Sequence, residues 1–218
     1  MRFIKHWFEK KPVATKAKET LSETYNHKYG HYDYSQDSRV LDKSFLKTFE
    51  DSFSEDAHKN AIVCGANSGY EINIIKNIKP KIIITAVDIS DISLKQLHAN
   101  FPDVELLHED LENLSALDSK SFGMYICLRA IHSSNIDITK AINEAVRVTR
   151  NKIILSISNG YLINGELVKG MYDYETKTID PKKPFMIRDT IFNLLNDLGW
   201  KTEMKESEAE IFIVAVPN

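Results

Sequence analysis

The chain has 218 residues, 43% of them hydrophobic, and a formal net charge of -3. This length fits one α/β domain with an extra segment and is too short for two large domains. The slightly acidic balance disfavours nucleic acid as a partner, because a phosphate backbone is attracted by a basic surface. The sequence has neither an apolar run long enough to cross a bilayer nor the apolar core of a signal peptide, so we expect a cytoplasmic protein without membrane association.

Residues 1–58 carry aromatic and charged residues at irregular spacing, with helical patterning at 16–24 and 40–49. Between these segments lies YNHKYGHYDY (25–34), which contains four tyrosines. One hypothesis is a helix end whose tyrosines pack on the core and keep their hydroxyls in water. The other is that 1–58 forms a helical lid over a ligand. In that case, we expect four of its side chains to bind the substrate: Tyr25, Tyr29, His31 and Tyr34.

The core begins at 61–88. An apolar run ends at Cys64, a turn with Gly65, Asn67 and Gly69 follows, and a helical segment leads to a second apolar run that ends at Asp88. This pattern predicts a strand, a tight turn, a helix and a strand. In a parallel sheet, the turn and the acid lie at the same carboxyl edge, where open α/β sheets bind their ligands. A nucleoside-bearing cofactor is the ligand that this arrangement favours.

Strands and helices continue to alternate after Asp88, which predicts a mostly parallel sheet with right-handed crossovers. We expect Ser90 to cap a helix that ends before Phe101-Pro102. An amphipathic helix is predicted at 138–149. Three further strands are expected at 104–108, 122–128 and 152–157.

The alternation of predicted strands and helices ends after 152–157. The connection at 158–185 contains three glycines and two prolines, and we interpret it as a substrate-side insertion because connections of this length tend to be functional. A helix is predicted at 186–198, with Gly199 as its C-terminal cap. The last two strands, at 200–206 and 210–216, are close enough in sequence to form an antiparallel hairpin.

In this order, the motifs resemble the class I S-adenosylmethionine-dependent methyltransferases over about 59–217. The matching features are CGANSG at 64–69, the acids Asp88 and Asp110, FGMYICLRAIHSS at 122–134, a helix that ends in an Arg-Val pair, and the closing hairpin. The resemblance implies a Rossmann-like, mostly parallel seven-stranded sheet with helices on both faces, and a methyltransferase core at 59–218. The chain departs from the family pattern at three positions: Val63, Asn67 and Gly123.

The resemblance also implies a cofactor site. Asp88 would accept hydrogen bonds from the vicinal ribose hydroxyls, Ile89 would pack on the adenine, and Asp110 would accept from the adenine amino group. The alternatives are a helix-capping role for Asp88 and a solvated loop acid at Asp110. Glycines in the turn would let the backbone approach the cofactor, although an ordinary strand-to-helix turn also uses them. The implied cofactor-binding residues are Gly65, Ala66, Asn67, Gly69, Asp88, Ile89, Asp110, Leu111 and Leu128.

Residues beside strand 122–128 are the candidates for chemistry. His132 stands where the family's substrate faces the cofactor and is the candidate general base, or else it caps the following loop or packs on the sheet. Arg129 would bind a substrate carboxylate or phosphate, or else form a salt bridge with a helix acid. From the long connection, the residues expected to line the acceptor pocket are Asn159, Tyr161 and Tyr172.

The sequence therefore predicts transfer of a methyl group from S-adenosylmethionine to an oxygen or nitrogen of a small molecule, as in biosynthesis of a specialised metabolite, mainly by proximity and orientation. A protein or RNA methyltransferase and a non-catalytic binding protein of the same fold remain alternatives. A nicotinamide site is disfavoured, since its fingerprint requires glycine where Asn67 and Tyr70 stand. No metal site is expected, and the two cysteines, Cys64 and Cys127, are interpreted as core residues.

Overall fold

The computed structural model describes residues 22–23, 25–26, 42–53, 59–133, 135–173 and 178–218. The helices are α4 (Phe45–Phe53), α5 (Tyr70–Ile78), α6 (Asp91–Asn100), α7 (Ile138–Val148) and α8 (Lys183–Asp197). The main sheet contains β1 (Asn60–Cys64), β2 (Ile83–Asp88), β3 (Glu105–His108), β4 (Phe122–Leu128), β5 (Thr149–Ser158), β10 (Trp200–Glu206) and β11 (Glu210–Pro217). Four short strands lie between β5 and α8: β6 (Gly160–Ile163), β7 (Glu166–Lys169), β8 (Met171–Asp173) and β9 (Thr178–Asp180).

The seven main strands form one sheet in the order β10-β11-β5-β4-β1-β2-β3. The strands β1 to β5 pair in parallel, whereas β11 runs antiparallel to both β5 and β10. The strand order reverses between β1 and β4, and the crevice at such a switch point is where open α/β sheets bind ligands. The predicted fold class, with its antiparallel C-terminal hairpin, is confirmed.

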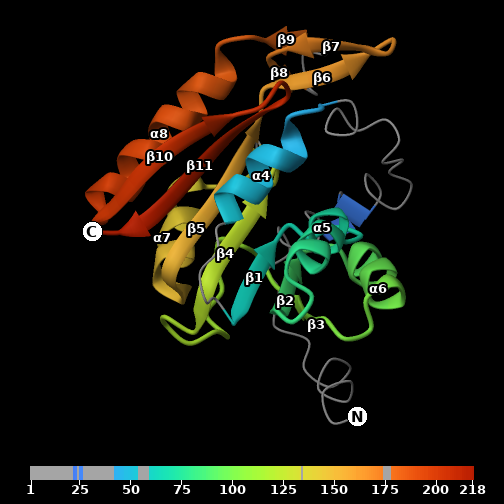
Figure 1. Cartoon of the computed structure of the whole chain (residues 1–218), viewed down its shortest axis with the longest axis vertical. Coiled ribbons are helices and arrows are strands. Elements are labelled where there is room, and N and C mark those ends of the chain that lie inside the picture. The colour runs from blue at the N-terminus through green and yellow to red at the C-terminus, as the bar shows by residue number, and fades with distance from the viewer. Residues whose placement is uncertain (1–21, 24, 27–41, 54–58, 134, 174–177) are drawn as a thin grey trace.

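Helices cover both faces of this sheet (Figure 1). Alternate residues of β1 point to opposite faces, so Val63 packs with α4 and α5 while Ile62 packs with α7 and α8. The first face is rich in aromatic side chains, among them Phe45 and Phe49 of α4. Since both faces are apolar along the central strands, burial holds the strand ends, and the turns after them, in fixed places.

The connection between β5 and α8 differs from the sequence prediction, which placed no strand there. It forms two antiparallel hairpins, β6–β7 and β8–β9. The first turns at Asn164 and Gly165, whose φ values of 52° and 83° suit the two-residue turn that Asn-Gly favours. That dipeptide was the signal in the sequence for this hairpin. The described part of the insertion thus forms two short antiparallel hairpins at the top of Figure 1.

The predicted helix at 40–49 lies further along the chain, as α4. Its start is fixed by Asp42, whose Oδ1 accepts the backbone N–H groups of Ser44 and Phe45, at 2.9 and 3.0 Å. The other oxygen, Oδ2, accepts the N–H of Ala209 at 2.7 Å. Asp42 is 5% exposed, so this carboxylate joins the start of α4 to the turn between β10 and β11. Of the helix predicted at 16–24, the structure describes residues 22–23, which are helical, and residues 25–26 just after it are helical too.

Two predicted helix ends are confirmed. The Ser90 side chain caps α6 by accepting the N–H of Ser93 at 3.2 Å. Gly199 follows α8 with a φ of 79°, in the left-handed region that glycine adopts at helix ends. None of the described helices is long and apolar enough to cross a membrane.

Candidate active site

The turn after β1 is held against the end of β2. The backbone N–H groups of Gly65 and Ala66 both donate to the carbonyl oxygen of Val87, at 2.9 and 3.2 Å. Gly65 has a φ of 69°, and a methyl group at this position would collide with the Cβ of Ala130, in the segment after β4. Packing against Ala130, within the protein, therefore requires glycine at position 65. Contact of Gly65 and Ala66 with the cofactor stays a prediction.

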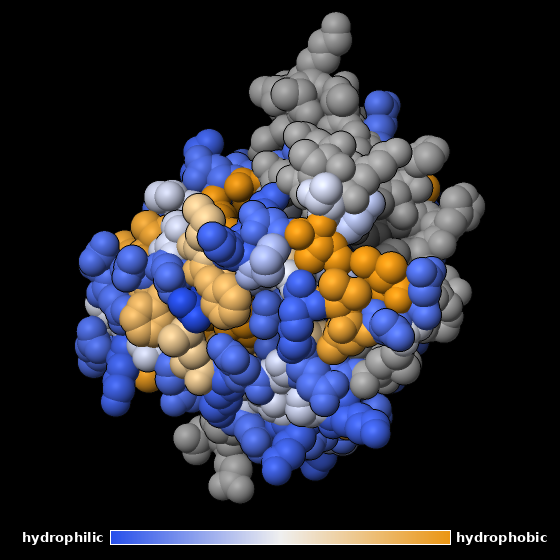
Figure 2. Space-filling view, turned by 90° about the horizontal axis from the view of Figure 1, so that it is seen from above, coloured by the Kyte–Doolittle hydropathy of each residue, from blue (hydrophilic) through white to orange (hydrophobic). Residues whose placement is uncertain are grey.

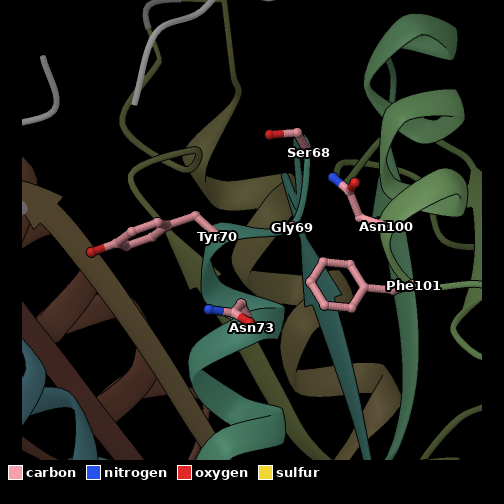
Figure 3. A pocket seen from close by; sticks show the side chains of 6 residues that line it. All are labelled: Ser68, Gly69, Tyr70, Asn73, Asn100 and Phe101. Carbon is pink, nitrogen blue, oxygen red and sulfur yellow. The ribbon is translucent and has the colours of Figure 1, made fainter. Parts of the chain in front are cut away.

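Gly69 is constrained in a similar way on the other side of the turn. Its φ is 96°, and a Cβ would lie 2.6 Å from the ring of Phe101, which follows α6. An open hollow of about 250 Å³ adjoins this contact, with Tyr70 and Asn73 on α5 and Asn100 at the end of α6. Figure 3 shows Phe101 facing Gly69, while the Tyr70 ring points to the opposite side. The hollow therefore borders the turn from the side of α6.

Asp88, at the end of β2, is tied to the glycine turn. Its Oδ2 accepts the N–H of Asn67 at 2.8 Å, and its Oδ1 accepts the N–H of Ser90 at 2.8 Å. Asn67 has a φ of 46°, so the residue that replaces the family's middle glycine adopts a glycine-like conformation. Burial raises the pKa of Asp88, although the amides of Ser90 and Asn67 and the nearby His108 oppose the shift. Because Ser90 caps α6, Asp88 is not needed as the helix cap.

Next to Asp88, the main chain of Ile89 is fixed from two directions. Its carbonyl oxygen lies 2.8 Å from Nε2 of His108 and accepts the hydroxyl of Ser22 at 2.8 Å. The Nδ1 of His108 lies 3.3 Å from the Asp91 carboxylate at the start of α6. The sequence interpretation missed this role of His108, which β3 brings to the end of β2 by parallel pairing.

The described residues 22–23 and 25–26 reach this edge from the N-terminal side, where they are drawn in blue beside α5 and α6 (Figure 1). Asn26 Oδ1 accepts the Ser90 hydroxyl at 2.7 Å. Tyr25 shares a short hydrogen bond with the hydroxyl of Ser133, in the segment after β4. Burial raises the pKa of Tyr25, and the negative charges of Asp88 and Asp110 add to the shift. Tyr25 therefore stays protonated at neutral pH, near the two candidate cofactor acids.

The remaining candidate cofactor residues lie at the ends of β3 and β4. Asp110 Oδ1 accepts the N–H of Glu112 at 2.9 Å, which orders the loop after β3. Leu111 and Leu128 are buried, at 8% and 3% exposure. The negative charges of Asp110 and Asp88 both raise the pKa of Tyr25, so these two predicted acids lie in one region of the structure.

Arg129 is engaged within the protein. Its Nε donates to Oε1 of Glu210, which is the first residue of β11 and is fully buried. The alternative of a salt bridge is therefore the one that the structure supports, with a strand acid as the partner instead of a helix acid. Little in the sequence pointed to this pair, since 81 residues separate its members.

His132 lies in the turn after β4, partly buried, and the N–H of the next residue, Ser133, donates to the carbonyl oxygen of Ala130 at 3.0 Å. The turn thus presents His132 and Ser133 at the carboxyl edge. Its Ser133 end faces Tyr25, and its Ala130 end faces Gly65.

The structure brings together two of the predicted acceptor residues from the insertion. The rings of Tyr161 on β6 and Tyr172 on β8 lie 6.1 Å apart, centroid to centroid, at 54°. Asn159 is buried, and its backbone N–H donates to the carbonyl oxygen of Ala209 at 2.7 Å. The lid candidates Tyr29, His31 and Tyr34 lie outside the described residues.

Both cysteines are in the core, as expected: Cys64 and Cys127 are 1% and 0% exposed. Burial raises the pKa of Cys127 to about 12 and that of Cys64 well above its usual range. Within the described ranges, no three His, Cys, Asp or Glu side chains are grouped so that they could hold a metal ion.

Residues 62–157 match a family model described as a methyltransferase domain. No curated protein sequence matches the chain. A methyltransferase from Aquifex aeolicus shares the fold at 14% identity, with a TM-score of 0.59, over 86% of this chain and 100% of that chain. The N-methyltransferase NodS from Bradyrhizobium japonicum, bound to S-adenosylhomocysteine, does so at 10% identity and a TM-score of 0.64, over 90% and 98%. Magnesium protoporphyrin IX methyltransferase from Synechocystis shares the fold at 13% identity, with a TM-score of 0.60, over 92% of this chain and 99% of that chain.

The structural likeness confirms the fold, and the model match assigns a methyltransferase domain to the part of the chain that carries the candidate cofactor residues. Residues 62–157 therefore form a methyltransferase domain. The match agrees with the class and the enzyme type that the sequence predicted, and the S-adenosylhomocysteine bound to NodS agrees with the predicted cofactor.

Proposed function

We propose that the protein transfers the methyl group of S-adenosylmethionine to an oxygen or nitrogen of a small-molecule acceptor. The observation that carries this proposal is the Asp88 carboxylate at the end of β2, the strand beside β1 at the strand-order switch. The amide of Asn67 joins this carboxylate to the glycine turn. The carboxylate presents a fixed, negatively charged acceptor at the edge where α/β sheets bind nucleosides.

The donor set fits the cofactor. The Asp88 oxygens accept the backbone amides of Asn67 and Ser90, and a carboxylate offers about four acceptor positions, so acceptor capacity remains for ribose hydroxyls. Once bound, the cofactor supplies a methyl group that is already electrophilic. The work left to the chain's own residues is to bind, to orient an acceptor in line with the methyl carbon, and to exclude water.

For the acceptor, we propose a pocket between the N-terminal lid at 1–58 and the insertion at 158–185. The paired rings of Tyr161 and Tyr172 supply an aromatic wall, and the exposed Ile163 and Val168 add apolar surface on the first hairpin. Seen from above, hydrophobic groups are set within a largely hydrophilic surface (Figure 2). A small-molecule acceptor is supported by one similar structure, a methyltransferase of magnesium protoporphyrin IX, and an N-acceptor by another, an N-methyltransferase.

His132 is proposed as the general base for acceptors that must lose a proton. The turn after β4 places it next to Ser133, which contacts Tyr25. With acceptors that are nucleophilic without deprotonation, proximity and orientation suffice.

Isothermal titration calorimetry with S-adenosylmethionine, S-adenosylhomocysteine and NAD tests the cofactor site. We expect micromolar binding of both sulfur nucleosides and none of NAD. Asp88→Ala should weaken this binding by more than about tenfold, because charge-assisted hydrogen bonds are lost. Asp197→Ala, at an exposed acid at the end of α8, is the matched control. Unchanged affinity of Asp88→Ala would reject the assigned role.

The acceptor class is tested by incubating the protein with S-adenosylmethionine and separate pools of small molecules, protein and RNA, and measuring S-adenosylhomocysteine release. Turnover with a small molecule that carries a hydroxyl or amine is the expected result. Turnover confined to the protein or RNA pool would overturn the small-molecule proposal and leave the cofactor site intact.

A further inference from the structure

We propose that Glu210 is a positioning residue for methyl transfer, which acts through Arg129 to fix the turn that carries His132 and Ser133. This inference deepens the proposed function and rests on it, since the turn matters only if the carboxyl edge binds the cofactor.

Glu210 and Arg129 behave as one unit. Glu210 is fully buried and Arg129 has a side-chain exposure of 14%, and the Nε of the guanidinium donates to Oε1 of the carboxylate. The strand β5 lies between β4 and β11, so the contact reaches across a strand. Removing one partner of a buried pair leaves an uncompensated charge, which costs far more than a surface contact.

The acid itself is held rigidly. Glu210 pairs with Ser158 of β5, and its N–H donates to the Ser207 hydroxyl at 3.2 Å while its carbonyl oxygen accepts the N–H of Ser207 at 2.9 Å. The neighbouring Ala209 is bound by the buried Asp42 carboxylate. Glu210 therefore has a fixed position, and its ion pair with Arg129 can hold the irregular segment after β4 in place.

That segment begins at Arg129, which has a φ of 63°, in the left-handed region that residues with a side chain rarely adopt. Its N–H donates to the carbonyl oxygen of Ser156 at 3.2 Å. The backbone bond and the ion pair together hold a conformation that the chain would otherwise leave.

The position of Arg129 sets the positions of the residues after it in the turn. Ala130 packs against Gly65 so closely that no methyl group fits there, Ile131 is fully buried, and Ser133 bonds Tyr25. A displaced Arg129 would thus shift one edge of the glycine turn, the candidate base and the Tyr25 contact together. A strand acid outside the cofactor site thereby sets the geometry inside it.

The test measures S-adenosylhomocysteine affinity by calorimetry well below each variant's melting temperature, with folding checked by circular dichroism. Glu210→Gln and Arg129→Gln should each weaken binding about fivefold to tenfold, as expected when hydrogen-bonding geometry at the site is lost. The double variant should lose no more than either single one, because the two residues act as a unit. Glu203→Gln, an exposed acid on the neighbouring β10, should bind like the wild type.

Hydrogen exchange of the ligand-free protein gives a second readout. Glu210→Gln should speed exchange in 129–133 and in 65–69, with little change in the central strands. Melting temperatures that fall while affinity and exchange in these segments stay unchanged would reduce Glu210 to a structural role and overturn the inference. Wild-type protein that fails to bind S-adenosylhomocysteine would instead overturn the proposed function, and the exchange result would still decide whether Glu210 positions the turn.

Discussion

The backbone amide of Asn67 donates to the Asp88 carboxylate over 2.8 Å, so the glycine turn after β1 and the acid that ends β2 form one rigid unit. The second carboxylate oxygen is held by Ser90, at the start of α6. An acceptor group fixed in this way before the ligand arrives loses little conformational freedom on binding, which favours affinity.

The raised pKa of Asp88 predicts a pH dependence. A carboxyl group with a raised pKa takes up its proton at a higher pH than an ordinary Asp, and protonation removes the charged acceptor. We therefore expect S-adenosylhomocysteine affinity to be constant at neutral pH and to fall on acidification through that raised pKa. Calorimetry between neutral and mildly acidic pH measures this. Asp88→Asn should bind weakly and lack the acid limb, and an acid limb that persists in this variant would assign the titration to another group.

Tyr25→Phe should weaken cofactor binding by about twofold to tenfold, the range for one hydrogen bond. The hydroxyl stays protonated, contacts Ser133 and lies near Asp88 and Asp110, so its loss loosens the lid where it meets the site. Titration with S-adenosylhomocysteine measures the change. Tyr172→Phe is the control on the insertion, and equal effects of the two substitutions would argue against a special place for Tyr25.

His132→Ala separates the two modes of catalysis. With an acceptor that must be deprotonated, we expect a loss in kcat of about 10²-fold or more and a small change in cofactor affinity. The measurement is steady-state kinetics with an acceptor identified by the pool assay. Full activity of this variant would mean that proximity alone drives the transfer.

Asp42→Ala should lower the free energy of unfolding by roughly 2 kcal/mol, because hydrogen bonds from Ser44, Phe45 and Ala209 converge on this buried carboxylate. Burial alone would raise the pKa of Asp42, but hydrogen bonds from Ser207, Ala209 and Ser44 outweigh it and lower the pKa. A lowered pKa stabilises the fold above the unfolded-state pKa, and this contribution is lost as pH falls through the folded-state value. Urea unfolding at several pH values should therefore show less acid sensitivity in the variant than in the wild type.

The two thiols should be inert in the folded protein. Burial keeps Cys64 and Cys127 protonated, and only the thiolate is a good nucleophile. A thiol-reactive chromogenic disulfide should label neither cysteine under native conditions and both after unfolding in guanidinium chloride. Rapid labelling of the native protein would show that the central strands open readily.

Most of the fold was predictable because the central strands are buried on both faces and read as short apolar runs. The 122–128 prediction coincides with β4, and the C-terminal hairpin follows from two predicted strands a few residues apart. The hairpins β6–β7 and β8–β9 were missed, since each of their strands has only three or four residues. The Asn164-Gly165 turn alone marked the first of them.

The site was predictable only where it follows strand ends. Parallel pairing places Asp88 and the glycine turn at the same edge whatever the rest of the chain does. Contacts such as Arg129 with Glu210, or Tyr25 with Ser133, join residues about a hundred positions apart and depend on the folded topology. A glutamate at the start of an apolar strand did hint at a buried partner, since an unpaired buried charge is costly.

The packing of Gly65 against Ala130 makes these two positions a coupled pair for protein engineering. A directed-evolution library aimed at new acceptors would naturally randomise the turn after β4, yet a bulkier residue at 130 would press on the cofactor turn. Diversity is better introduced at 132 and on the insertion, with 130 kept small. Among natural relatives, the same constraint predicts covariation of the two positions.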